Sequence, residues 1–207
     1  MDASEFTDAV RDENRTALSR LGSSKALYAD TEGEMNAETI LGAAADRAYH
    51  AAETFAAWAD EESDEEAGDL FSSVAASERD HHETIVDERG EHEPGDPPAV
   101  QQHLRGVEET TARLGALVGW ALTATRNTDQ LVGYFVGQAD PQTASTFRDI
   151  SGDQEEYVDD AAGVLADVVA DEEREDALAA ASDAVQADYD AYFETLESLG
   201  INPKPVC

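Results

Sequence analysis

The stretch that decides the fold runs from Phe71 to Ile85 and reads FSSVAASERDHHETI. Its apolar residues Phe71, Val74 and Ile85 lie on one stripe of an α-helix, since the stripe advances by alternating steps of three and four residues. The same steps also lead to Glu78 and His81. Because charged side chains are almost never fully buried unless they are paired or bound, we expect this pair to have a partner or a ligand inside the fold.

Two interpretations of Glu78 and His81 are open. Glu-x-x-His projecting into a helical bundle is the pair of ligands that di-iron carboxylate proteins take from one helix. The alternative is a buried, hydrogen-bonded polar pair without a metal, which proteins also build. The next two residues, His82 and Glu83, are turned about 100° further round the helix per residue, and we expect them at its solvated edge.

The composition combines a large negative charge with a regular apolar pattern. The 207 residues include 47 acidic and 13 basic ones, a net charge of −34, and Lys25 and Lys204 are the only lysines. Because 41% of the residues are hydrophobic and recur periodically, we expect a folded chain with an acidic surface, suited to a high-salt cytosol that screens its self-repulsion. The same charge argues against direct binding to nucleic acid, which needs a basic face.

The sequence also bears on the compartment. Cys207 is the only cysteine, so no intrachain disulfide can form, which fits a reducing cytosol. The first residues are acidic and amphipathic, unlike a signal peptide. No apolar run approaches the roughly 20 residues needed to span a bilayer. We therefore expect a cytoplasmic protein that does not enter a membrane.

Helical periodicity recurs along the chain without any strand pattern, so the predicted class is all-α. The start signals are Asn36, the capping boxes that open at Ser63 and Asn127, and Asp140 before a proline, while Gly90 is a stop signal. The predicted helices are 4–29, 37–61, 64–89, 97–125, 127–138, 141–169 and 172–199.

A weak internal repeat indicates two related helical halves. The spacing from Phe71 to His81 recurs at Phe147, Gln154 and Tyr157, where Gln and Tyr occupy the positions of the Glu and the His. The second half would then have lost its ligand pair. We expect an N-terminal half at 1–90, a linker at 91–97, a C-terminal half at 98–200 and a tail at 201–207.

The segment from Phe55 to Ile85, FAAWADEESDEEAGDLFSSVAASERDHHETI, resembles the rubrerythrin and ferritin-like superfamily, and the chain is similar to a divergent member of haloarchaeal type. This resemblance implies a ferritin-like up-down helical bundle that holds two irons with two Glu-x-x-His pairs and two further carboxylates. It also implies peroxidase or oxidase activity. On this basis Glu78 and His81 are candidate ligands for iron, manganese or zinc.

The sequence departs from that family pattern. The second Glu-x-x-His is absent, and the position a little over thirty residues before Glu78 holds Ala45 and Asp46 rather than a glutamate. A stripe of weaker candidate ligands points away from the apolar face and is expected to face water unless another element covers it; it consists of Asp46, His50 and Glu53. Further candidates off the apolar stripes are Glu108, Glu109, Glu155 and Glu156, with His103 as a core histidine or a third ligand.

Two functions remain open from the sequence. The first is a rubrerythrin-like metal-binding protein, an oxidoreductase in peroxide or iron handling. It would need an external reductant, because the four cysteines of a rubredoxin-like module are absent. The second is a metal-free ferritin-like helical protein with an interaction or regulatory role, for example in a transcription-antitermination assembly. A homo-oligomer is compatible with both.

Overall fold

The computed structural model describes residues 2–90 and 92–203, and over these ranges the chain forms helices and no strand, so the all-α prediction is confirmed. Cys207 and the end of the predicted tail lie outside the described residues. The helices are α1 (Ala3–Glu13), α2 (Arg15–Leu21), α3 (Ser24–Asp30), α4 (Ala37–Glu61), α5 (Glu65–Arg89), α6 (Ala99–Leu104), α7 (Thr110–Gly137), α8 (Pro141–Val168), the 3-10 turn η1 (Asp171–Glu173) and α9 (Arg174–Ser198).

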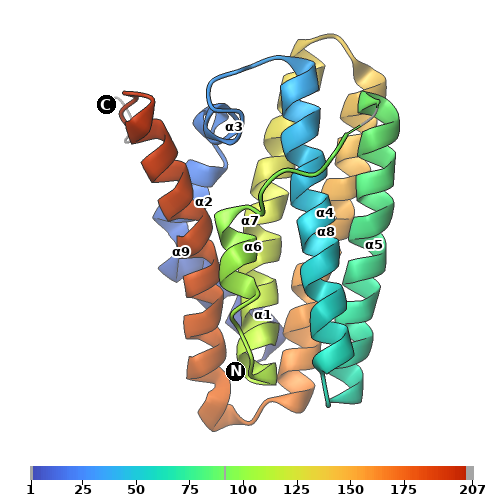
Figure 1. Ribbon diagram of the computed structural model, residues 1–207. Coiled ribbons are helices and arrows are strands. Elements are labelled where there is room, and N and C mark those ends of the chain that lie inside the picture. The colour runs from blue at the N-terminus through green and yellow to red at the C-terminus, as the bar shows by residue number, and fades with distance from the viewer. Residues whose placement is uncertain (1, 91, 204–207) are drawn as a thin grey trace.

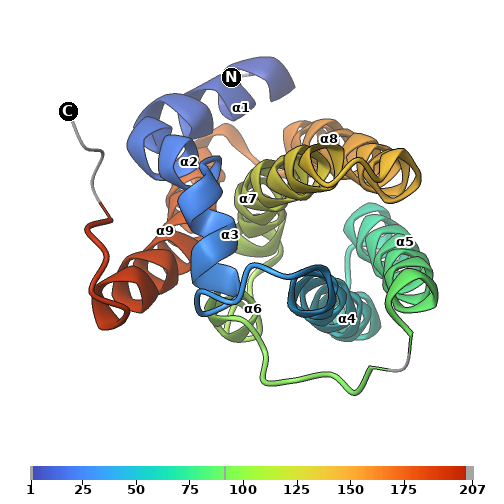
Figure 2. The same cartoon turned by 90° about the horizontal axis from the view of Figure 1, so that it is seen from above.

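Four long helices form a bundle of two antiparallel hairpins, α4 with α5 and α7 with α8 (Figure 2). The turns of the two hairpins lie at opposite ends of the bundle, so α5 and α7 run in the same direction (Figure 1). The helical bundle expected from the sequence is therefore present, and its two hairpins are not joined by a short turn. One long crossover, containing α6, connects the hairpins along the side of α4.

The remaining helices cover the α7 side of the bundle. Helix α9 packs along α7, and α1, α2 and α3 lie across α7, α8 and α9 (Figure 2). The single helix expected over 4–29 is wrong, because it breaks at Asn14 and again before Ser23, which is extended. The Asn14 amide donates to the Val10 carbonyl and to Ser182, so this side chain competes with the backbone for hydrogen bonds.

Three further helix boundaries differ from the prediction. The helix expected over 97–125 is divided into α6 and α7, with Gly106 between them. No new helix begins at Asn127, because α7 continues through it and the Asn127 side chain bonds to Asp30 instead of capping. At the start of α5 the cap is Asp64 rather than Ser63, since the Asp64 carboxylate accepts from two backbone amides.

The other helix ends follow the sequence signals. Asn36 and Asp140 accept hydrogen bonds from the first turns of α4 and α8. Gly90 ends α5 with a φ of 96°, a conformation that favours glycine. Inside the bundle, aromatic rings from three helices pack edge to face, namely Phe55, Trp58, Phe71 and Trp120. Burial of each such side chain stabilises the fold by about 1.5–3 kcal/mol.

Candidate functional site

Glu78 and His81 lie in the middle of α5 and point into the bundle. Their exposed fractions are 1% and 6%, so the prediction that both lie on the buried stripe of the helix is confirmed. The Nδ1 atom of His81 is 3.1 Å from Oε1 of Glu78. Both residues lie one turn apart on the same face, which is why a spacing of three brings the two groups together.

A second carboxylate, which the sequence did not indicate, reaches His81 from α8. Nε2 of His81 is 2.9 Å from Oδ2 of Asp153. Half of the Asp153 side chain is exposed. Its place on the helix therefore gives no sequence signal of a functional site, unlike a charged residue on an apolar stripe. The imidazole of His81 therefore lies between two carboxylates, one fully buried and one at the surface.

The surroundings shift the proton affinity of two groups here. Burial lowers the pKa of His81, but the hydrogen bond and charge of Glu78, followed by those of Asp153, outweigh it and raise the pKa above its ordinary value. Burial and the negative charge of Glu78 raise the pKa of Tyr157, whose hydroxyl donates to Ser77 over 2.6 Å. Tyr157 is therefore a neutral hydrogen-bond donor throughout the physiological range.

The α8 residues that match the Glu-x-x-His pair in the repeat also face the core. Gln154 and Tyr157 are 6% and 7% exposed, as predicted. The amide oxygen of Gln154 accepts from the hydroxyl of Thr128 over 2.8 Å.

These groups surround a small hollow, here named the inner cavity, with a volume of about 30 Å³. It is lined by apolar side chains and by a few polar ones, which are Arg47, Glu78, His81, Asn127, Thr128 and Gln154. A site of this size has room for about one water molecule or one ion.

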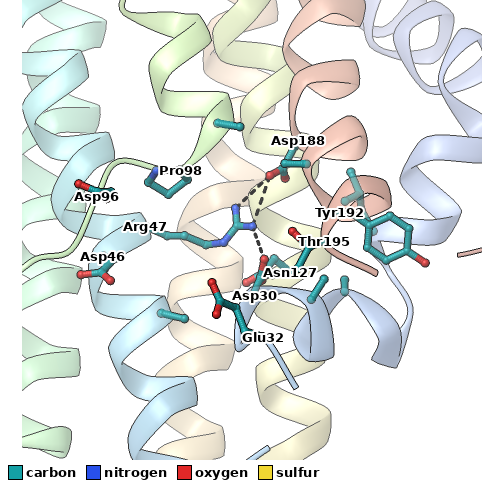
Figure 3. A pocket seen from close by; sticks show the side chains of 16 residues that line it. Asp30, Glu32, Asp46, Arg47, Asp96, Pro98, Asn127, Asp188, Tyr192 and Thr195 are labelled. Carbon is teal, nitrogen blue, oxygen red and sulfur yellow. Dashed lines mark hydrogen bonds and ion pairs between the residues drawn. The ribbon is translucent and has the colours of Figure 1, made fainter. Parts of the chain in front are cut away.

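A larger hollow opens on the other side of Arg47 and is here named the outer cleft (Figure 3). Its volume is about 250 Å³, and it lies between α3, α4, α9 and the crossover. The charged residues that line it are Asp30, Glu32, Asp46, Arg47, Asp96 and Asp188.

Arg47 is held at the boundary between the two hollows. Its Nη2 donates to Oδ1 of Asp30 over 2.7 Å, and both terminal nitrogens are 3.3 Å from Oδ1 of Asp188 (Figure 3). Burial disfavours the guanidinium charge, but Asp188 and Asp30 outweigh burial and raise its pKa. The sequence signal was available, because Arg47 lies between Ala44 and Ala51 on the apolar stripe of α4.

The stripe of weaker candidate ligands does not face water as a whole. The crossover covers Asp46, whose Oδ1 accepts from His92 over 2.6 Å and from the Gly95 amide over 3.0 Å. His50 is buried, donates from Nε2 to the Gly95 carbonyl and accepts at Nδ1 from Arg105. Only Glu53 of the three is exposed, so the stripe serves to bind the crossover to α4.

The other candidates lie away from the bundle core. His103 is half-buried, and His82 is not at a fully solvated edge, since its Nδ1 donates to the Ala45 carbonyl over 3.0 Å. Over residues 2–90 and 92–203, no three or more His, Cys, Asp or Glu side chains converge as a set of metal ligands. The four remaining candidate ligands are exposed carboxylates, namely Glu108, Glu109, Glu155 and Glu156.

Comparison with known proteins adds no family. Neither the family models, the curated proteins nor the solved structures contain a match to this chain. In the part of the chain that the structure describes, none of the helices is both long and apolar enough to cross a bilayer.

Proposed function

We propose that the protein binds one divalent metal ion in the bundle core, with Glu78 and His81 as its side-chain ligands. The observation that carries the proposal is the orientation of His81, whose Nε2 donates to Asp153 while Nδ1 faces Glu78 at the inner cavity. Metal-binding histidines almost always give their second ring N–H to a carboxylate or a carbonyl, which fixes the tautomer and the ring.

The distance between the two groups supports the same assignment. Oε1 of Glu78 and Nδ1 of His81 are 3.1 Å apart. Two ligands at about 2.0–2.2 Å from one ion, at nearly a right angle, are separated by about 3 Å. The pair therefore needs little rearrangement to bind an ion, and the same separation makes a hydrogen bond when none is bound.

The residues around the cavity fit one ion and not two. A two-iron site needs carboxylates from all four helices, but α4 contributes Ala44, Arg47 and Ala48 here, and α7 contributes Ala124 and Thr128. The remaining oxygen donors at the cavity are water and the side chains of Asn127, Thr128 and Gln154.

Iron, manganese and zinc all accept carboxylate and imidazole ligands. A redox-active ion with open positions supplies a binding place for peroxide or dioxygen. An oxidoreductase role in peroxide or iron handling, with an external reductant, is the activity we propose on this basis. The single long crossover between the hairpins, a feature of ferritin-like folds, supports the family resemblance.

A second candidate is a metal-free protein with an interaction or regulatory role. It is favoured by the position of His81, because both of its ring nitrogens face carboxylates, as in a doubly protonated imidazolium. The guanidinium of Arg47 lines the same cavity and would repel a cation, although Asp30 and Asp188 balance its charge.

Metal stoichiometry separates the two candidates. Untagged protein is stripped with a chelator, titrated calorimetrically with Mn²⁺, Co²⁺ or Zn²⁺, and analysed for bound metal after gel filtration. We expect about one ion per chain in the wild type and none in the double variant Glu78→Leu/His81→Leu. The matched control is His50→Gln, which removes another buried histidine and should retain the ion. Absence of binding in the wild type, or equal binding in the double variant, would refute the proposal.

A further inference from the structure

The outer cleft and the inner cavity meet at two residues. Arg47 of α4 and Asn127 of α7 line both hollows. On one side of them lies the buried pair Glu78 and His81, and on the other the cleft between α3, α4 and α9. An ion that moves directly from the outer cleft to the inner cavity has to pass the side chains of Arg47 and Asn127.

One carboxylate holds both of them in place. Oδ1 of Asp30 accepts from Arg47 over 2.7 Å, and its other oxygen accepts from the amide of Asn127. Asp188, only 4% exposed, holds the guanidinium from the side of α9. Figure 3 shows Arg47 extending into the middle of the cleft, with dashed lines to both carboxylates.

The net negative charge of the outer cleft favours the approach of cations. Five carboxylates line it against one guanidinium; they belong to Asp30, Glu32, Asp46, Asp96 and Asp188. A cleft lined by one sign of charge concentrates counter-ions and raises their rate of association. The cleft therefore favours cations over anions at the entrance to the core.

We propose that Arg47 is a gate for cations, latched by Asp30 and Asp188, between the outer cleft and the inner cavity. The identity of the passing cation as the metal for Glu78 and His81 rests on the function proposed above. Movement of the Arg47 side chain opens the passage and needs no movement of the α4 backbone. Charge attracts the ion to the cleft, and the two ion pairs of Arg47 limit the rate at which it enters.

A cysteine in the inner cavity tests the gate without relying on Glu78 and His81. Cys207, the only cysteine, is replaced by Ser, and Thr128→Cys places a thiol of similar size in the cavity wall. The measured quantity is the rate at which this thiol reacts with Ag⁺, a single small cation that replaces the thiol proton. Thr123→Cys is the control position, since Thr123 lies on the same helix, is 1% exposed and lines neither hollow.

Opening the gate should accelerate modification at the cavity alone. In Arg47→Ala we expect the Thr128→Cys thiol to react at least about tenfold faster, because two partly buried ion pairs no longer close the passage. The Thr123→Cys rate should stay nearly constant. Asp30→Ala, which keeps Arg47, should also accelerate the reaction of the Thr128→Cys thiol more than that of the Thr123→Cys thiol. It replaces Arg47→Ala in this test if that variant does not fold. Arg113→Ala removes another buried, ion-paired arginine away from both hollows and should show no preference.

The outcomes separate the gate from the metal. Equal acceleration at Thr128→Cys and Thr123→Cys, or none at either, would overturn the gate. The rate of Co²⁺ uptake is then measured in the wild type and in Arg47→Ala. If Arg47→Ala accelerates the reaction at Thr128→Cys alone and no Co²⁺ binds, the gate is supported and the metal site is refuted. If Co²⁺ binds at the same rate in both proteins and Arg47→Ala does not accelerate the reaction at Thr128→Cys, the gate is refuted and the metal site is supported.

Discussion

At the scale of single residues, His81 is the group on which the chemistry depends. It lies between a carboxylate that is almost fully buried, Glu78, and one that is half exposed, Asp153. A proton and a metal ion compete for its Nδ1, because both would lie between that atom and Glu78. The pH dependence of stability in the metal-free protein therefore reports on this site.

The first prediction concerns pH in the metal-free protein. Because the folded-state pKa of His81 is raised above its unfolded value of about 6.5, its contribution to stability is complete below that pH and is lost as the pH rises through the folded pKa. The thermal midpoint of the wild type should therefore exceed that of His81→Gln most at acidic pH. The difference should shrink on going to alkaline pH, and a constant difference would contradict the account.

The second prediction compares single and double apolar substitutions in the presence of a chelator. His81→Leu leaves Glu78 buried without its partner and should cost about 3–5 kcal/mol of unfolding free energy. Glu78→Leu should cost less, since His81 retains Asp153. The double variant should be close to neutral, because no buried charge is left unpaired. Denaturant unfolding measures all three, and additive costs in the double variant would show that the two residues do not act as a pair.

At the scale of helices, the backbones of α7 and α9 lie in close contact at two glycines of α7. A Cβ atom placed on Gly115 would lie 2.0 Å from the Ala177 carbonyl oxygen, and one on Gly119 would lie 2.2 Å from that of Ala181. The backbones approach this closely because small residues face one another along both helices. Helix α9 in turn carries Asp188, one of the two partners of Arg47.

The third prediction follows from this contact. Gly115→Ala and Gly119→Ala should each destabilise the protein by at least about 1–3 kcal/mol, since the helices must separate to admit the methyl group. Gly133→Ala is the control on the same helix, where nothing lies within 4 Å of the added Cβ. It should stabilise by about 0.5–1 kcal/mol through helix propensity. Urea unfolding of the three variants checks this, and equal effects would contradict the packing.

Much of this arrangement was predictable from the sequence, because it depends on residues that are close to one another along the chain. The start of α4 at Asn36, the end of α5 at Gly90 and the inward pair Glu78 and His81 depend on residues a few positions apart. The break at Asn14 depends on Ser182, which is distant in sequence. Helical periodicity cannot show such partners.

The missed residues of the site have the same explanation. Arg47 and Asp188 each occupy an apolar stripe, as Glu78 does, and the rule that identified Glu78 would have found them too. Asp153 gave no signal, because an exposed carboxylate on an acidic helix is ordinary. The crossover that covers His50 has no periodicity from which its path could be read.

At the scale of the whole molecule, the net charge of −34 acts on every element at once. Few cations are available to balance it, and Arg47 and Arg113 are two that are committed to buried or partly buried pairs. Mutual repulsion of the remaining carboxylates opposes the compact state and decreases as salt shortens the Debye length, from about 10 Å at 0.1 M to about 3 Å at 1 M.

The fourth prediction is therefore a strong salt dependence. The thermal midpoint followed by circular dichroism should rise between 0.1 and 3 M KCl, and helical signal should be lost below roughly 0.5 M, where screening weakens. Sucrose stabilises folded states by exclusion without screening and is the control. A midpoint that does not change with KCl would refute the adaptation to high salt.

In the metal-bound protein we expect the ion on Nδ1 of His81, while Nε2 keeps its proton for Asp153. Long-range ¹H–¹⁵N spectra resolve the ring nitrogens of the five histidines, and Zn²⁺ is added to the metal-free protein. The account predicts that Nδ1 of His81 alone moves to a metal-bound shift, and that Nε2 of the same ring remains protonated. An unchanged His81 spectrum at saturating Zn²⁺, or a response at His50 or His92 instead, would contradict it.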